Sequence, residues 1–185
     1  MLAQQTETIT LNRSPHFDFL STMHDHLCPK QVLGVRMGLL AVQLLRLELP
    51  VRDKRLFAFV ETDGCFVDGV SVVTDCAVGH RTLRVIDYGK VAATFVDIEM
   101  NRSIRLRPHR ASRLRALEYA PGAMDRWHAQ LAAYQVMPDE ELFESMPVEL
   151  TVDLPAIISQ HGQRVVCADC GEEVMNEREV KRGGE

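Results

Sequence analysis

The feature that most constrains the fold is an apolar stretch at residues 30–49, bounded by Pro29 and Pro50. Its hydrophobic side chains cover much of a helix surface rather than one narrow stripe, and they are Val32, Val35, Met37, Leu39, Leu40, Val42, Leu44, Leu45 and Leu47. A proline is tolerated in the first turn of a helix, where its missing N–H costs no hydrogen bond. The stretch therefore predicts a helix that begins near Pro29 and is buried by a sheet or by a second subunit.

Two glycines, Gly34 and Gly38, lie four residues apart on this predicted helix. One helix face therefore lacks side chains, and another backbone can approach it closely. Close packing against a neighbouring strand or helix is a better interpretation of this pair than a ligand contact.

Periodicity along the rest of the chain predicts an α+β fold. Helical patterns occur at residues 16–23, 66–76, 111–119, 124–135 and 139–144. Strand patterns occur at residues 56–60, 83–87, 91–98, 102–107 and 148–154. Because turn residues separate the strands between 83 and 107, we expect an antiparallel meander there, and overall helices packed on a mainly antiparallel sheet.

Composition limits the class of protein. The 185 residues are 46% hydrophobic, which is enough for a proper core. The net charge of −5 argues against nucleic-acid or membrane-surface binding as the main task. The polar start of the chain contains no signal-like apolar segment, and no later apolar run is long enough to cross a bilayer. The 5 cysteines are an odd number, so a complete set of disulfides is excluded, and we expect a cytoplasmic protein with free thiols.

Three side chains that bind soft metals fall within five residues in His24-Asp25-His26-Leu27-Cys28. One histidine alone would be explained as a loop residue bonded to backbone carbonyls. On an extended segment, however, His24, His26 and Cys28 would face the same side and hold one ion jointly. Mixed nitrogen and sulfur ligands suit zinc, nickel, copper or iron better than magnesium or calcium.

Cys65 follows the strand predicted at residues 56–60 and lies at the start of the next predicted helix. The positive end of a helix dipole stabilises a thiolate, so its pKa is expected to fall below the free value of about 8.5. Cys65 is therefore predicted to be a fourth metal ligand or a catalytic nucleophile, the alternative being a small buried residue. Cys76, near the end of the same helix, fits an apolar filler or the second thiol of a redox pair.

The segment after Pro155 is polar and contains Cys167-Ala168-Asp169-Cys170-Gly171. Cys-x-x-Cys-Gly is the turn of a zinc knuckle, because the glycine lets backbone N–H groups bend toward the sulfurs. Cys167 and Cys170 supply only half of a four-ligand site, so we expect that His161 and another group complete it, that a partner does, or that the tail is a truncated version of a longer one.

Several motifs occur in an order that resembles the FmdE family, which takes its name from a component of formylmethanofuran dehydrogenase. They are His24-Asp25-His26-Leu27-Cys28-Pro29, Gly34, Asp63-Gly64-Cys65-x-x-Asp68, Thr74-Asp75-Cys76-x-x-Gly79 and Asp87-Tyr88-Gly89-Lys90. The resemblance implies a dimeric α+β core over residues 1–155 with a metal-binding cleft, and a partial zinc-finger-like tail over residues 156–185. It also implies that Lys90 and Tyr88 contact a cofactor or substrate, where the residues alone indicate an exposed hairpin corner.

The only basic stretch runs from residue 102 to residue 115 and contains Arg102, Arg105, Arg107, Arg110, Arg113 and Arg115. Such a run is typical of a solvated face, and it is also suited to an acidic partner or an anionic ligand.

Three functions follow from these patterns. The first is a dimeric metal-binding protein, with zinc or another transition metal such as nickel or iron, that acts as an enzyme on a small substrate. The second is a metal carrier, sensor or accessory protein that acts on a partner through its Cys-x-x-Cys tail. The third is thiol redox chemistry or sulfur transfer by Cys65 and Cys76.

Overall fold

The computed structural model describes residues 15–51, 53–154, 157, 162–175 and 178–183. The chain divides into two compact units, one up to Val148 and one from Glu149 onward. The helices of the first unit are α1 (Pro15–His24), α2 (Pro29–Leu45), α3 (Cys65–Thr74), α4 (Ser112–Tyr119), α5 (Arg126–Ala133) and α6 (Asp139–Leu142). Its strands are β1 (Leu56–Val60), β2 (Leu83–Val85), β3 (Ala93–Asp97), β4 (Arg102–Pro108) and β5 (Phe143–Pro147).

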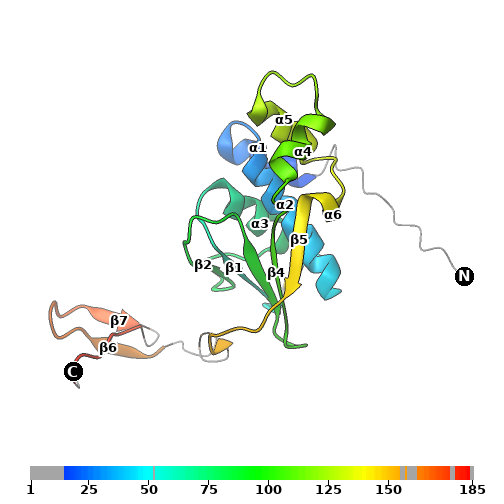
Figure 1. Cartoon of the computed structure of the whole chain (residues 1–185). Coiled ribbons are helices and arrows are strands. Elements are labelled where there is room, and N and C mark those ends of the chain that lie inside the picture. The colour runs from blue at the N-terminus through cyan, green and yellow to red at the C-terminus, as the bar shows by residue number, and fades with distance from the viewer. Residues whose placement is uncertain (1–14, 52, 155–156, 158–161, 176–177, 184–185) are drawn as a thin grey trace, which may run out of the picture. The chain divides into compact units, whose positions relative to one another are not determined.

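The five strands form one sheet in the order β2-β1-β3-β4-β5 (Figure 1). All neighbours are antiparallel except β1 and β2, which are parallel. The predicted α+β class with a mainly antiparallel sheet is confirmed. The predicted meander is wrong in one respect, because β1 lies between β2 and β3. Helix α3 connects β1 to β2, and a helical crossover makes the two strands parallel neighbours.

The end of the first unit also differs from the sequence-based expectation. The last strand is Phe143–Pro147 rather than residues 148–154, and α6 ends at Leu142. Phe143 is 5% exposed and pairs with Pro108 of β4, so burial of this aromatic ring fixes the start of the strand. Pro147 is compatible with β5 because this strand lies at the sheet edge, where a missing N–H is tolerated.

Helix α2 is the buried helix that its apolar stretch predicts, and it packs against α3 and the sheet (Figure 1). It begins at Pro29, as predicted, but ends at Leu45 rather than continuing to residue 49. Arg46 adopts a left-handed conformation with φ 58°, and the N–H of Leu47 returns to the carbonyl of Val42. This hydrogen-bond pattern ends a helix even where the sequence stays apolar.

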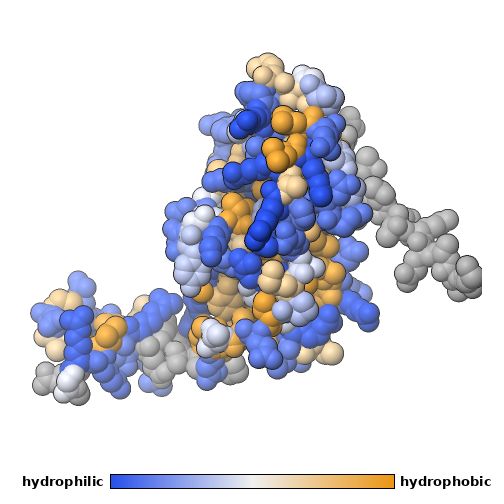
Figure 2. Space-filling view, in the orientation of Figure 1, coloured by the Kyte–Doolittle hydropathy of each residue, from blue (hydrophilic) through white to orange (hydrophobic). Residues whose placement is uncertain are grey.

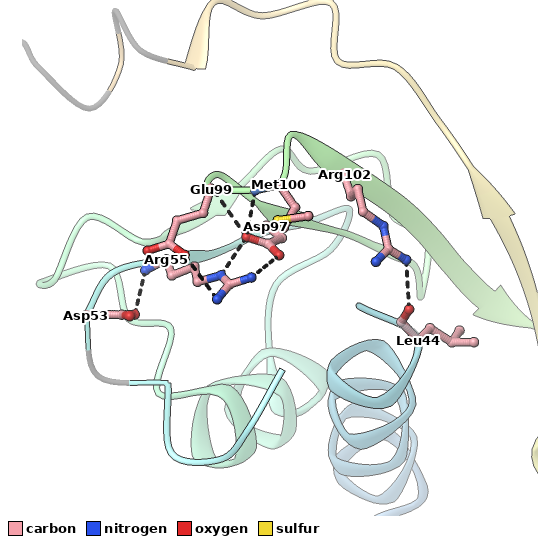
Figure 3. Close-up of polar contacts among 7 residues, drawn as sticks. All are labelled: Leu44, Asp53, Arg55, Asp97, Glu99, Met100 and Arg102. Carbon is pink, nitrogen blue, oxygen red and sulfur yellow. Dashed lines mark hydrogen bonds and ion pairs between the residues drawn. The ribbon is translucent and has the colours of Figure 1, made fainter. Parts of the chain in front are cut away.

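A buried carboxylate lies at the end of β3, next to the start of β1 (Figure 3). The Asp97 side chain is 0% exposed and accepts two hydrogen bonds from the Arg55 guanidinium, at 2.8 and 2.7 Å. It also accepts backbone N–H groups from Glu99 and Met100. The Arg55 hydrogen bonds hold the pKa of Asp97 below its ordinary value, despite its burial. The start of β1 is thereby tied to the β3–β4 turn.

The second unit contains an antiparallel pair, β6 (Arg164–Val166) and β7 (Glu173–Met175). In the described part of the whole chain, none of the helices combines the length and the hydropathy needed to span a bilayer.

Candidate functional site

The predicted site residues of the first unit gather where three helices have their ends. His24 is the last residue of α1, Cys28 is the N-cap of α2, and Cys65 is the first residue of α3. The N–H of Cys28 donates to the Gln31 side chain at 2.7 Å, which orders the start of α2. Asp25 has φ 59° in the short turn between α1 and α2. The sequence around Pro29 therefore places His24 and Cys28 close to α3.

The Cys28 and Cys65 thiols are neighbours, close enough for Cys28 to raise the pKa of Cys65. Cys28 is buried and Cys65 is half-buried, and neither forms a disulfide. Burial is the main cause that raises the pKa of Cys65, and the Cys28 thiol and the Asp68 carboxylate raise it further. The expectation of a lowered pKa at Cys65 is therefore wrong, because these effects outweigh the helix dipole.

His24 pairs with Asp68 in the first turn of α3, with its Nε2 atom 2.7 Å from the carboxylate. Both side chains are about a third exposed, at 31% and 32%. A carboxylate on one ring nitrogen orients the imidazole and leaves Nδ1 for another partner. No role was predicted for Asp68 from its motif, although its i+3 spacing from Cys65 places both residues on one side of α3.

His26 is exposed and lies against Trp127 of α5, with ring centroids 6.4 Å apart. The four predicted ligands of this unit therefore lie near one another around these helix ends, but they do not form one coordination sphere. They are His24, His26, Cys28 and Cys65. Among the described residues, no group of three or more His, Cys, Asp and Glu side chains is arranged to hold a metal ion.

Cys76 has a different environment from Cys65. It is 1% exposed, its thiol donates to the Leu56 carbonyl at 3.3 Å, and burial raises its pKa to about 11. Cys65 begins the ten-residue helix α3 and Cys76 follows its end. The two lie roughly 15 Å apart along the helix axis at about 1.5 Å per residue, too far for a disulfide. The predicted redox pair of Cys65 and Cys76 is therefore wrong, and Cys76 is a buried filler.

Tyr88 and Lys90 lie in the exposed turn before β3. The Lys90 ammonium stands 5.7 Å from the centroid of the Tyr88 ring, and both backbone N–H groups donate to the Glu61 carbonyl. Neither side chain lines a described cavity, but the next residue, Val91, does.

That cavity has a volume of about 450 Å³ and opens beside Cys28. It is bounded by the start of α2, the β4–α4 connection and one side of α5, and its lining residues are Cys28, Pro29, Lys30, Leu33, Val91, Pro108, His109, Arg110, Ser112, Arg113, Trp127, Gln130 and Tyr134. Neither Trp127 nor His109 was predicted as a site residue from the sequence, although Trp127 is the single tryptophan of the chain.

The basic stretch separates into two groups in the structure. Arg105 and Arg107 form ion pairs with Glu61 and Glu144, while Arg102 and Arg115 donate to backbone carbonyls. Arg110 and Arg113 instead line the cavity. Figure 2 shows hydrophilic side chains over most of the face that carries β4 and α4, broken by an orange patch over α4.

The tail cysteines lie in the turn between β6 and β7. The backbone N–H groups of Cys170 and Asp169 lower the pKa of Cys167, as the predicted knuckle turn requires. The N–H of Gly171 donates to the Cys167 carbonyl at 2.9 Å, with Gly171 at φ 75°. Predicted ligand His161 lies outside the described residues.

Comparison with known proteins gives three findings. A family model described as "FmdE, Molybdenum formylmethanofuran dehydrogenase operon" matches residues 23–144. A probable S-adenosyl-L-methionine-binding protein of Archaeoglobus fulgidus is 40% identical over 76 residues, which are 40% of this chain and only 21% of that relative. The crystal structure of an FmdE-like protein of the tungsten formylmethanofuran dehydrogenase type from Syntrophus aciditrophicus superposes with a TM-score of 0.62 and 20% identity, over 90% of this chain and 88% of that one. At this identity the structural likeness establishes the fold.

Proposed function

The chain belongs to the FmdE family, and from that premise we propose that it binds a transition-metal ion at the helix ends of its core. Cys28 and Cys65 are the thiolate ligands and His24 is the nitrogen ligand. The observation that carries this proposal is that the Cys28 and Cys65 thiols are neighbours, although they come from the starts of two different helices.

The donor set suits a soft or borderline ion. Two thiols and an imidazole match zinc, iron or nickel better than magnesium or calcium. The Asp68 carboxylate on Nε2 of His24 corresponds to the outer partner that metal-binding histidines commonly have. His24 pairs with Asp68, whereas Cys28 neighbours Cys65. The proposal therefore requires the His24 ring, at the end of α1, to turn toward the thiols as the ion binds.

Metal binding changes the protonation of these groups. A bound ion needs its cysteine ligands as thiolates, so loading must release the proton of Cys65, whose pKa is raised by burial. When bound with an open position, such an ion supplies Lewis acidity toward a substrate oxygen. Asp68 orients His24, and the half-buried position of Cys65 limits the access of water.

Cobalt(II) binding tests this proposal, because cobalt thiolates absorb strongly in the near ultraviolet. The test uses protein in which Cys167 and Cys170 are both changed to Ser, so that the tail contributes no thiolates. We expect one cobalt per chain, loss of the thiolate absorption in Cys28→Ser and Cys65→Ser, and weaker binding in His24→Ala. Cys76→Ala is the matched control, because this thiol lies at the other end of α3, and it should bind like the parent. Retained thiolate absorption in the double variant Cys28→Ser/Cys65→Ser would overturn the assignment.

The proximity of the two thiols also favours a second candidate, a reversible disulfide between Cys28 and Cys65. Each thiol would lose one proton and one electron to a disulfide acceptor such as oxidised glutathione. Mass mapping of metal-free protein after such oxidation distinguishes the two candidates. A Cys28–Cys65 disulfide with no cobalt binding in the reduced protein supports redox chemistry.

Two finer features belong to this proposal. The tail binds zinc through Cys167 and Cys170, with the remaining ligands supplied from outside the described residues or by a partner. The core forms a homodimer, for which the exposed Phe19 and Met23 of α1 provide apolar surface.

Because the Archaeoglobus relative is named a probable S-adenosyl-L-methionine-binding protein, S-adenosyl-L-methionine is a candidate ligand for this chain. Its sulfonium and ammonium groups are cationic, and the cavity beside Cys28 is lined by basic side chains without an acidic one. The charge of this cavity therefore favours an anion over S-adenosyl-L-methionine.

A further inference from the structure

The cavity beside Cys28 has the size of a small-molecule site. Its volume of about 450 Å³ falls within the range of about 300–1,000 Å³ that is usual for such sites. Its walls come from α2, the β4–α4 connection and α5, segments far apart in the sequence. All of them belong to the first compact unit.

The charge of the lining is one-sided. Lys30, Arg110 and Arg113 line the cavity together with His109, and no aspartate or glutamate does. This contrasts with the whole chain, whose net charge is −5. A concentration of positive charge in one cavity of an acidic protein attracts anions.

These cations are not neutralised within the protein. Among the described residues, Lys30, Arg110 and Arg113 form no ion pair, whereas Arg105 and Arg107 of the same basic stretch do. The Glu144 carboxylate lies 4.0 Å from His109 of the lining, and it is held by an ion pair with Arg107. Two arginines with free guanidinium groups are well suited to a carboxylate or a phosphate.

The rest of the lining is apolar or aromatic. Leu33 and Val91 contribute aliphatic surface, and Trp127 contributes an indole that is 41% exposed. Tyr134 is 2% exposed and its hydroxyl lies beside Ser112, so its ring forms a buried wall of the cavity. A ligand for this cavity therefore needs a flat apolar body as well as a negative charge.

We propose that this cavity binds a small organic anion, with its carboxylate or phosphate on Arg110, Arg113 and Lys30 and its body against Trp127. Because Cys28 is part of the same lining, the bound anion lies beside the proposed metal ligands and represents the substrate class of that site. Only this substrate role rests on the proposed function. Binding itself depends on the cavity alone.

Trp127 fluorescence provides the test, because it is the only tryptophan in the chain. The metal-free protein, kept in a chelator, is titrated with phenyl phosphate, benzoate, neutral benzamide and inorganic phosphate. We expect a saturable change in Trp127 emission with phenyl phosphate or benzoate, and much weaker binding of benzamide. The ratio between phenyl phosphate and benzoate tells which anionic group the cavity prefers.

Variants locate the site. Arg110→Gln and Arg113→Gln should each weaken binding about tenfold, since each removes a charge-assisted hydrogen bond. Arg46→Ala is the matched control, because it removes the same charge at the opposite end of α2, roughly 25 Å away at about 1.5 Å per residue. Equal affinity for benzamide and benzoate, or unchanged affinity in both arginine variants, would overturn the proposal.

A last comparison separates this inference from the metal proposal. Cys65→Ser, a change outside the lining of the cavity, should abolish cobalt binding in the protein without tail cysteines but retain anion binding. If the parent binds no cobalt yet still binds benzoate through Arg110 and Arg113, the anion site stands and the metal site fails.

Discussion

Gly34 of α2 and Gly69 of α3 face each other where the two helices cross, and each would obstruct the other if it carried a side chain. A Cβ atom on Gly34 would lie 3.0 Å from the Cα of Gly69, and a Cβ on Gly69 would lie 3.0 Å from the Cα of Gly34. Each would come still closer to a backbone carbonyl, that of Phe66 or that of Gln31. Gly69 lies about one helical turn after Cys65, and Gly34 lies fewer than two turns after Cys28, so this contact also helps to set the spacing of the two cysteines.

Gly69→Ala is predicted to lower the free energy of unfolding by about 3 kcal/mol, because the new methyl group meets backbone rather than a flexible side chain. Urea denaturation followed by circular dichroism measures this change. Gly122→Ala is the matched control, since no atom lies within 4 Å of a Cβ built there, and it should stay within about 0.5 kcal/mol of wild type. Equal stability of the two variants would contradict the close helix crossing.

This helix crossing illustrates which parts of the fold the sequence could predict. The apolar periodicity of α2, its start at Pro29 and the close approach at Gly34 are local signals, and they are confirmed. The partner, Gly69, lies in a distant segment, and no local pattern identifies which two helices meet. The parallel pairing of β2 with β1 was missed for the same reason.

The candidate site shows the same division. Ligand types and local spacing predicted His24, Cys28 and Cys65 as candidate ligands, because these are properties of short segments. The pairing of His24 with Asp68 and the side of the cavity formed by Trp127 depend on how α1, α3 and α5 pack. The pKa of Cys65 was predicted in the wrong direction because the helix end was visible in the sequence, whereas the burial and the Cys28 thiol were not.

Asp97→Asn is predicted to destabilise the protein by about 2–3 kcal/mol at pH 7, because it weakens a buried ion pair with Arg55. A carboxyl group whose pKa is lowered by folding stabilises the protein above its unfolded pKa of about 3.9 and loses this contribution as the pH falls through the folded value. Wild type and Asp97→Asn should therefore converge in stability in acid. Urea midpoints between pH 7 and pH 3 measure this effect.

Glu99→Gln is the control for this pair. Glu99 bonds the same guanidinium at 3.0 Å, but its side chain is 58% exposed. An exposed ion pair contributes little, so the change should be below about 1 kcal/mol. If Glu99→Gln costs as much as Asp97→Asn, burial of Asp97 is not the source of the stabilisation.

The thiols of the reduced, metal-free protein should react with iodoacetamide in a defined order. The pKa of Cys167 is lowered by backbone N–H groups, whereas the pKa of Cys65 is raised by burial and by Cys28. Because the thiolate is the nucleophile, Cys167 should be alkylated first at pH 7, and Cys65 should need a higher pH. Peptide mass spectrometry over a pH series measures both rates. Cys28→Ser should shift the Cys65 profile to lower pH, and faster alkylation of Cys65 than of Cys167 at pH 7 would contradict the assignment.

The proposed homodimer is predicted to depend on α1. Phe19 and Met23 lie one helical turn apart and are 56% and 52% exposed, so both present apolar surface on one side of the helix. They line a hollow of about 460 Å³ together with Val72 of α3. Burying this surface against a second copy would remove it from water, which favours association. Phe19→Ser/Met23→Ser should therefore convert the dimer to a monomer, as measured by light scattering after gel filtration.

Leu114→Ser, which removes a 71% exposed side chain from α4, should leave the mass of the dimer unchanged. A monomeric wild type, or a dimer that Leu114→Ser dissociates and the α1 variant does not, would contradict this interface.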